Sequence, residues 1–212
     1  MNEPLRRRSV VDELADRLRG EILDGSIAAG APLREVELSE SYEVSRHTLR
    51  AALRELASEG VVEIEPHRGA RVAALADEQL VGLYEVRTAL EVEAARLALE
   101  RNGGRLPDEV HRALARLAAA TEAKRPSWAT LARLHAELHT SIVEASGSPR
   151  IVSEYGRLAA ELRLFLLQLK PVWSPERMRL HHEELVAGLE REGADVLRKH
   201  LQDGALSVMV RA

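Results

Sequence analysis

The 212-residue sequence contains no cysteine, which excludes disulfide bonds, thiolate metal ligands and cysteine nucleophiles. Aromatic residues are scarce, at 3%, whereas 45% of the residues are hydrophobic. We therefore expect aliphatic, mostly helical cores, with enough apolar material for two compact domains. No run approaches the roughly 18–20 consecutive apolar residues of a membrane span, and the N-terminal segment lacks the apolar stretch of a signal peptide. These absences predict a cytoplasmic protein with no membrane partner.

Excess basic charge is also missing. Residues 1–71 contain 11 Arg and 14 Asp plus Glu, a net charge of −3. Binding to nucleic acid would therefore depend on local groups of arginines. Two such groups are present, namely Arg6 to Arg8 and the four-residue repeat Arg46, Arg50 and Arg54. The alternative for the repeat is a solvated helix face with ion pairs to Glu55 or Glu59.

The N-terminal third has the pattern of a helix-turn-helix. Residues 9–24 predict an amphipathic helix capped by Ser9, and a short helix is expected from about Arg34 to Tyr42. Ser45 is placed to cap a third helix that runs to about Glu59. The expected buried side chains are Val10, Leu14, Leu18 and Ile22, then Val36, Leu38 and Tyr42, then Leu49, Ala52, Leu53 and Leu56.

A β-hairpin is predicted directly after the third helix. Gly60 ends that helix, and the segments VVEIE and ARVAAL are β-rich runs joined by PHRG. The tip of this hairpin carries His67, Arg68 and Gly69, which are suited to contact a phosphate or the minor groove of DNA. An ordinary surface hairpin is the alternative.

Residues 14–72 resemble the winged helix-turn-helix domain of GntR-type transcription factors. The resemblance rests on these residues: Ile22, Gly25, Ile27, Gly30, Leu33, Glu35, Leu38, Val44, Ser45, Arg46, Leu49, Arg50, Ala52, Leu53, Leu56, Glu59, Gly60, Val61, Val62, Gly69, Ala70 and Val72. It implies DNA contacts by Arg34, Ser45, Arg46, His47, Thr48, Arg50 and Gly69. The chain departs from the family pattern at Ala29, Ser39, His47, Thr48 and Ala51, which concerns the operator sequence more than the fold.

A second, all-helical domain is expected after a join near residues 73–76, giving domains 1–75 and 76–212. Strand signals cease at Asp77, and helical periodicity follows to the end of the chain. The six expected helices span about 77–103, 107–122, 127–146, 148–170, 174–191 and 194–210, which indicates an antiparallel bundle. The first is expected to bury Leu80, Leu83, Val86, Leu90, Ala94, Leu97 and Leu99.

Five of the eight histidines lie between positions 135 and 200. His135 and His139 are four residues apart, so both imidazoles lie on one helix face and can bind one metal ion. His181 or His182 and His200 come from later helices. A nitrogen-rich cluster favours Zn²⁺, Ni²⁺, Cu²⁺ or Mn²⁺ over Ca²⁺ or Mg²⁺. The alternative is that these histidines are merely exposed or hydrogen-bonded.

Residues 77–205 resemble the FCD ligand-binding domain of the FadR branch, and six helices are typical of its VanR-like group. The matching segments are YEVRTALEVEAARLA, HAELHTSIVEASGS and HHEELVAGL. The resemblance implies a divalent metal such as Zn, Ni or Mn, held by His139, His182, His200 and His135, the last in place of an aspartate. His200 follows His182 more closely than is usual, so either the intervening turn or the helix itself is shorter.

The combined patterns predict a mainly α protein that acts as a homodimeric repressor on a pseudo-palindromic double-stranded DNA operator. A small organic acid bound at the metal site would release it, and Arg87 would pair with the acid's carboxylate. An internal salt bridge between Arg87 and Glu91 is the alternative for that arginine. We expect no enzymatic activity; the competing classes are a metal-dependent helical enzyme and an architectural DNA-binding protein whose bundle only dimerises.

Overall fold

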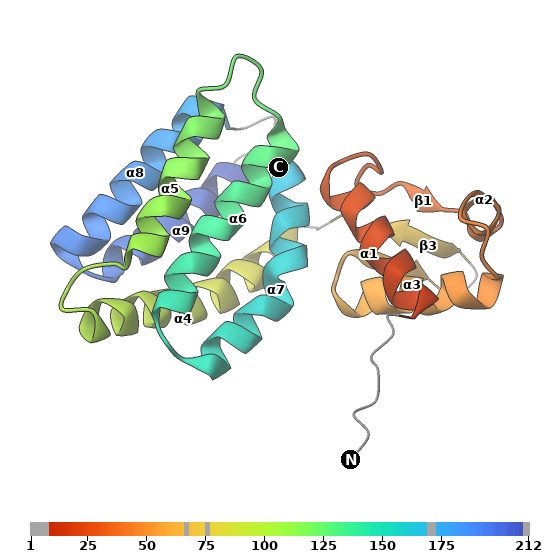
Figure 1. Ribbon diagram of the computed structural model, residues 1–212, viewed down its shortest axis with the longest axis horizontal. Coiled ribbons are helices and arrows are strands. Elements are labelled where there is room, and N and C mark those ends of the chain that lie inside the picture. The colour runs from red at the N-terminus through yellow and green to blue at the C-terminus, as the bar shows by residue number, and fades with distance from the viewer. Residues whose placement is uncertain (1–8, 66–67, 75–76, 169–172, 210–212) are drawn as a thin grey trace. The chain divides into compact units, whose positions relative to one another are not determined.

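The computed structural model describes residues 9–65, 68–74, 77–168 and 173–209. The chain divides into two compact units, Met1–Ala74 and Leu75–Ala212. Residues 75 and 76, on either side of the boundary expected from the sequence, lie outside the described residues. The described part is mostly helical, with a small sheet confined to the first unit, which confirms the predicted fold class. Figure 1 labels the elements.

The first unit combines three described helices with a three-stranded antiparallel sheet. Its helices are α1 (Val10–Leu23), α2 (Glu35–Ser41) and α3 (Arg46–Ser58). Its strands are β1 (Pro32–Leu33), β2 (Val62–Glu65) and β3 (Gly69–Val72), in the order β1-β3-β2. In the hairpin Val62 pairs with Val72 and Glu65 with Gly69. This is a helix-turn-helix followed by a wing.

Helices α1 and α3 begin where capping side chains are available, whereas α2 begins after Arg34 without a side-chain cap. The Ser9 hydroxyl accepts from the Asp12 backbone N–H at 3.1 Å, and the Asp12 carboxylate accepts from the Ser9 N–H at 3.0 Å. Ser45 caps α3 in the same way, accepting from the Thr48 N–H at 3.1 Å. The turn before it holds Glu43 at a φ of 53°, an unusual value for a residue with a side chain.

The core of the first unit follows the predicted stripes of α1 and α3, apart from Val10. Leu14, Leu18 and Ile22 of α1 are buried together with Leu49, Ala52, Leu53 and Leu56 of α3. Val10 and Val36, which were expected in the core, are 60% and 46% exposed because each lies in the first turn of its helix, beyond the packed face. Around α2, Leu38 and Tyr42 were also expected in the core but are only half-buried. Strand β1 was not predicted.

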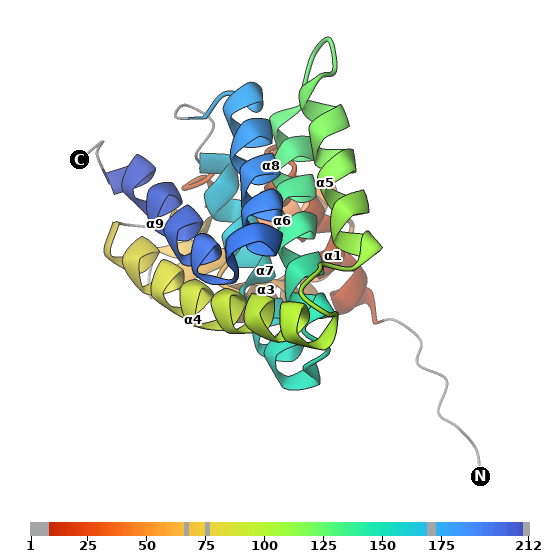
Figure 2. The same ribbon diagram turned by 90° about the vertical axis from the view of Figure 1, so that its left-hand side faces the viewer.

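Six helices form the described part of the second unit. They are α4 (Asp77–Arg101), α5 (Asp108–Thr121), α6 (Trp128–Ala145), α7 (Pro149–Gln168), α8 (Pro175–Glu192) and α9 (Asp195–Met209). Helix α6 is central, since it packs against α4, α5 and α7, while α8 packs against α5 and α9. Figure 2 shows α4 crossing beneath the upright helices α5, α6 and α8.

Helix α4 buries Leu80, Leu83, Ala94 and Leu99 as expected, and Leu90 and Leu97 are half-buried, but its inner face also holds two charged residues that were not expected there. Val86 was expected in the core but is 48% exposed, whereas Arg87 and Glu91 are buried. Tyr84, Ala95 and Ala98 complete the inner face. The polar pair faces inward because it meets other polar side chains there, and those side chains form the site described next.

Candidate functional site

Four histidines from three helices meet inside the bundle. His135 and His139 lie one turn apart on α6, His182 lies on α8 and His200 on α9. All four are buried. Gly193, with a φ of 93°, allows the short turn that folds α9 back along α8 and brings His200 next to His182.

Three of these histidines have the geometry of a metal site. The potential ligand atoms of His135, His139 and His182 all lie within 4.8 Å of one another. Among the described residues, these three form the group of side chains that could hold a metal ion. The Nε2 atoms of His139 and His182 are 3.3 Å apart. Two nitrogens on one tetrahedral ion with bonds of 2.0–2.1 Å are separated by roughly the same distance. The donor set therefore fits a divalent transition metal.

Hydrogen bonds orient two of the rings for this role. His139 directs Nδ1 at the Glu91 carboxylate at 2.6 Å, and the His182 Nδ1–H donates to the Met178 carbonyl at 2.6 Å. Each bond uses Nδ1 and leaves Nε2 available for the ion. The Nδ1 atom of His135 is buried, and no residue that the structure describes forms a hydrogen bond with it. A bound cation would give that nitrogen a partner.

His200 lies beside this group of three histidines but is not part of it. The His200 ring lies 4.8 Å from the His182 ring and 5.3 Å from the His139 ring, but it stacks on His181 at 4.1 Å. It is not among the three residues whose ligand atoms lie mutually within 4.8 Å. Burial, and then the neighbouring imidazoles, lower the pKa values of His135, His182 and His200 well below the usual value. The rings are therefore neutral at pH 7, the form that binds metals.

Glu91 is the centre of a buried polar network behind the histidines. Its carboxylate accepts from the Arg87 Nε–H, from the Tyr155 hydroxyl at 2.9 Å and from His139. Burial alone would raise the pKa of Glu91, but the Arg87 guanidinium and the hydrogen bond from His139 outweigh it and lower the pKa to about 2. The internal salt bridge between Arg87 and Glu91, one of the two alternatives from the sequence, is thus present.

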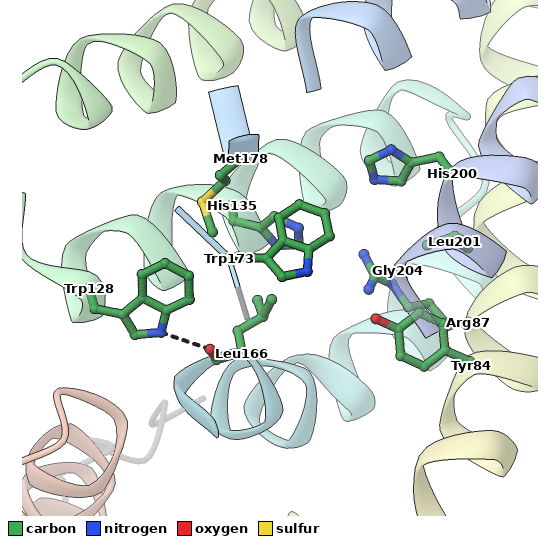
Figure 3. Close-up of a pocket in the computed structure, with 10 residues that line it drawn as sticks. All are labelled: Tyr84, Arg87, Trp128, His135, Leu166, Trp173, Met178, His200, Leu201 and Gly204. Carbon is green, nitrogen blue, oxygen red and sulfur yellow. Dashed lines mark hydrogen bonds between the residues drawn. The ribbon is translucent and has the colours of Figure 1, made fainter. Parts of the chain in front are cut away.

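Arg87 also faces a cavity next to the histidines. The cavity is lined by Tyr84, Arg87, Trp128, His135, Leu166, Trp173, Met178, His200, Leu201 and Gly204. In Figure 3 the Arg87 guanidinium and the Tyr84 hydroxyl lie together at one end, with Trp173 and His135 across from them. A ligand in this space would meet a buried arginine and two histidines of the cluster.

The predicted DNA contacts lie on the first unit, mostly in exposed positions. Ser45, Arg46, His47 and Arg50 are exposed at the start of α3, and Thr48 is half-buried. Arg34 and Gly69 are exposed, as is Arg68 at the hairpin tip. His67 and the arm Arg6 to Arg8 lie outside the described residues.

Several of these arginines form ion pairs. The Arg50 Nε–H donates to both carboxylate oxygens of Glu35, at 3.0 and 2.9 Å. Arg34 pairs with Glu37 and Arg68 with Glu65, each at 2.9 Å. The acids suggested by the sequence differ from these, because Glu59 binds Arg19 at 2.6 Å. No ion pair of Arg46 is found among the described residues, so Arg46 can bind a phosphate or base without losing one.

Sequence reasoning missed most of the residues that line the bundle site, and three of them illustrate why. Tyr155 of α7 completes the Glu91 network, and Trp173 and Met178 line the cavity. An Arg87–Glu91 pair could be anticipated from its four-residue spacing. Tyr155 and Trp173 lie on other segments of the chain and follow no local pattern, so only the three-dimensional structure identifies them.

Comparison with known families divides the chain as the structure does. Residues 10–72 match the family described as bacterial regulatory proteins, gntR family, and residues 82–203 match the FCD domain. The second match alone covers more than half of the chain. None of the described helices has both the length and the apolar composition that crossing a membrane requires.

Individual relatives are similar along most of their length. A probable D-xylose utilization operon transcriptional repressor of Paenarthrobacter nicotinovorans is 29% identical over 88% of this chain and 81% of its own. The HTH-type transcriptional repressor GlaR of Escherichia coli K12 is 29% identical over 87% and 89%, respectively. A gluconate operon transcriptional repressor of Bacillus licheniformis is 27% identical over 93% and 82%.

Solved structures share the fold. A putative GntR transcriptional regulator from Rhodococcus sp. RHA1 superposes with a TM-score of 0.78, with 24% identity over 95% of this chain and 98% of that chain. McbR/YncC of E. coli gives 0.73, with 21% identity over 97% and 100%. At these identities the likeness concerns the fold alone.

Proposed function

The chain belongs to the GntR family of bacterial regulatory proteins and carries an FCD domain, and from this premise we propose that it is a transcriptional repressor controlled by a small organic acid. Three relatives that align over most of the chain are named as transcriptional repressors, one of them as probable. The winged helix would bind the operator, and the bundle would bind the acid. The observation that carries the proposal is the cavity inside the bundle, which brings Arg87 together with His135 and His200.

The DNA-binding role is supported by the start of α3. Arg46 and His47 are exposed on its first turn, the portion of a recognition helix that meets base edges in the major groove. A homodimer would present two such helices to the half-sites of a pseudo-palindromic operator. Since residues 1–71 carry a net charge of −3, tight binding would need both heads together.

A divalent metal would be held by His135, His139 and His182, with His200 beside them. The ion would supply positive charge for an anionic ligand, and Zn²⁺, Ni²⁺ or Mn²⁺ suits a nitrogen donor set. Arg87 would add a fixed cation on the wall of the same cavity. Because the histidines are neutral and Arg87 is balanced by Glu91, the added ion would leave the site with excess positive charge, which favours a carboxylate.

The geometry favours regulation over hydrolysis. A hydrolytic metal enzyme needs a general base with a pKa near the working pH. Glu91, which hydrogen-bonds to His139, has its pKa lowered to about 2 and is held by three hydrogen-bond donors. It therefore orients His139 and does not accept a proton near pH 7. The bound acid would act by favouring a domain arrangement that no longer matches the operator.

A mobility-shift assay with the protein's own promoter region tests the proposal. We expect the metal-loaded protein to retard this fragment, and small organic acids to release it. Replacing Arg46 and Arg50 together by Ala should weaken binding at least about 30-fold, since each lost arginine contact is worth roughly 1–3 kcal/mol. The metal content of this variant should be unchanged.

The bundle site is tested by a His139→Ala, His182→Ala double variant. It should lose the metal and keep DNA binding, but acids should no longer release the DNA. The matched control is His111→Ala, which removes an exposed histidine of α5 that pairs with Glu190. Absence of retardation at low salt would refute the DNA-binding role, and acid release that persists in the double variant would refute the metal-site role.

A further inference from the structure

Aromatic residues, rare in the sequence, are concentrated around the cavity. The chain has two Trp, three Tyr and one Phe. Tyr84, Trp128 and Trp173 line the cavity itself. Phe165 packs edge-on against Tyr84 with ring centroids 5.6 Å apart, and the Tyr155 hydroxyl donates to Glu91, the ion-pair partner of Arg87. Of the six, Tyr42 alone belongs to the DNA-binding unit. The cavity wall is thus far more aromatic than the rest of the molecule.

The two tryptophans that line the cavity differ in their hydrogen bonding. The Trp128 indole N–H donates to the Leu166 carbonyl at 2.9 Å, so this side chain offers only its ring to a ligand. The Trp173 Nε1 atom is buried and has no hydrogen-bond partner among the described residues, and the residue as a whole is only 8% exposed. Figure 3 shows this nitrogen on the side of the cavity where Arg87 and Tyr84 lie. A buried donor without a partner is unfavourable, and an acceptor on a bound ligand would relieve it.

The rest of the wall is mostly apolar. Leu166, Met178 and Leu201 line it, and Gly204 contributes no side chain. A Cβ at position 204 would lie 3.2 Å from the Tyr84 hydroxyl, so the glycine keeps the space beside Tyr84 open. The polar groups belong to Arg87, Tyr84, His135, His200 and Trp173. The wall therefore has a polar portion and an extended apolar, aromatic portion.

We propose that the effector of this site is an arylcarboxylate, a small acid whose carboxylate is attached to an aromatic ring. The inference rests on the proposed function and specifies its ligand. The carboxylate binds at the polar end and accepts from the Trp173 indole N–H, while the ring packs against the aromatic wall. A sugar acid fits poorly, because each hydroxyl it buries needs a partner and Leu166, Met178 and Leu201 offer none from their side chains.

Calorimetric titration of the zinc-loaded, full-length protein tests this assignment. The probes are benzoate and phenylacetate as aryl acids, gluconate as a polyhydroxy acid and acetate as the bare carboxylate. We expect at least one aryl acid to bind at least 10-fold more tightly than gluconate and acetate. Tighter binding of gluconate than of both aryl acids would overturn the inference while leaving an acid-responsive repressor intact.

A Trp173→Phe variant tests the indole donor. Aryl-acid affinity should fall about 5–10-fold, because one hydrogen bond is lost while most of the aromatic wall remains. The matched control is Trp128→Phe, which removes a similar ring area from the wall but whose N–H is already bound to Leu166. It should lower affinity less than Trp173→Phe does, because only ring area is lost. Equal losses in the two variants would contradict a specific role for the Trp173 N–H.

Two further observations separate this inference from the proposed function. Gly204→Ala should weaken aryl acids more than acetate, because its Cβ forces the Tyr84 hydroxyl to move; equal weakening of both would argue against a ring in this space. If aryl acids bind but leave the DNA bound, the repressor mechanism fails and the ligand assignment stands. If no acid binds to the zinc-loaded protein, both fail.

Discussion

Buried neutral histidines make the metal-free protein sensitive to acid. Burial and neighbouring imidazoles lower the pKa values of His135, His182 and His200 in the folded state. In the unfolded chain each would have a pKa of about 6.5. Below that pH the unfolded state binds more protons, so the stabilising effect is complete above about pH 6.5 and is lost as the pH falls.

We predict that the metal-free protein loses roughly 4 kcal/mol of its free energy of unfolding between pH 7.5 and 5.5, about one third of it from each histidine. Urea denaturation in the presence of a chelator measures this loss. His200→Asn should reduce the loss by about one third. The matched control is His47→Asn, because His47 is exposed on α3. A stability that does not change over this pH range would contradict the prediction.

The ion pair between Arg50 and Glu35 competes with the proposed DNA contact of Arg50. To bind DNA, Arg50 would exchange Glu35 for a phosphate or a base, so we predict that Glu35→Gln strengthens operator binding a few-fold and steepens the dependence on salt concentration. The measurement is the operator dissociation constant at several salt concentrations. Glu40→Gln makes the same charge change on α2 and controls for the general loss of a negative charge. Equal effects of both substitutions would show that the pair itself has no influence.

At the level of elements, the contact between α8 and α9 depends on Gly188. A Cβ at this position would lie 2.9 Å from Cγ1 of Val196, which is too close. We predict that Gly188→Ala lowers the free energy of unfolding by about 1–3 kcal/mol through overpacking, despite the better helix propensity of alanine.

Gly156 of α7 provides the control for this substitution. Nothing lies within 4 Å of a Cβ placed there, so Gly156→Ala should raise stability by about 0.5–1 kcal/mol. Thermal or urea denaturation of the two variants, both in the metal-free form, gives the comparison. Stabilisation of both variants by similar amounts would mean that α8 and α9 adjust freely at their contact.

Helices were largely predictable from the sequence because their signals are local. Ser9, Ser45, Ser127 and Ser174 cap helices through their own hydroxyls, and helical periodicity fills the segments between. Strand β1 has two residues, too few for an alternating pattern, and it forms only because β3 lies beside it. The inner face of α4 was misjudged at Val86, since apolar periodicity cannot anticipate a buried ion pair.

The histidine site was predictable only in part. The four-residue spacing placed His135 and His139 on one face, and the family resemblance added His182 and His200. The stacking of His200 on His181 depends on how α8 and α9 pack, which no local pattern encodes. Tyr155 and Trp173 reach the site from other segments and gave no signal in the sequence.

At the level of the whole molecule, the proposed function assigns DNA binding to one compact unit and ligand binding to the other. We predict that a fragment of residues 1–74 binds the operator about 10²–10⁴-fold more weakly than the full chain, because it lacks the bundle that would deliver two heads together. Fluorescence anisotropy with a labelled operator measures both affinities. Circular dichroism must first show that the fragment is helical. Equal affinities would mean that dimerisation through the bundle contributes nothing.

The placement of the two tryptophans gives the protein an intrinsic optical reporter. Both Trp128 and Trp173 line the cavity, and the DNA-binding unit contains none. Emission excited at wavelengths that only indole absorbs therefore originates entirely beside this cavity. A change in the intensity or the emission maximum of this fluorescence on adding an acid reports occupancy of the cavity without any label. The same signal, followed during a DNA titration, shows whether operator binding changes the surroundings of the cavity.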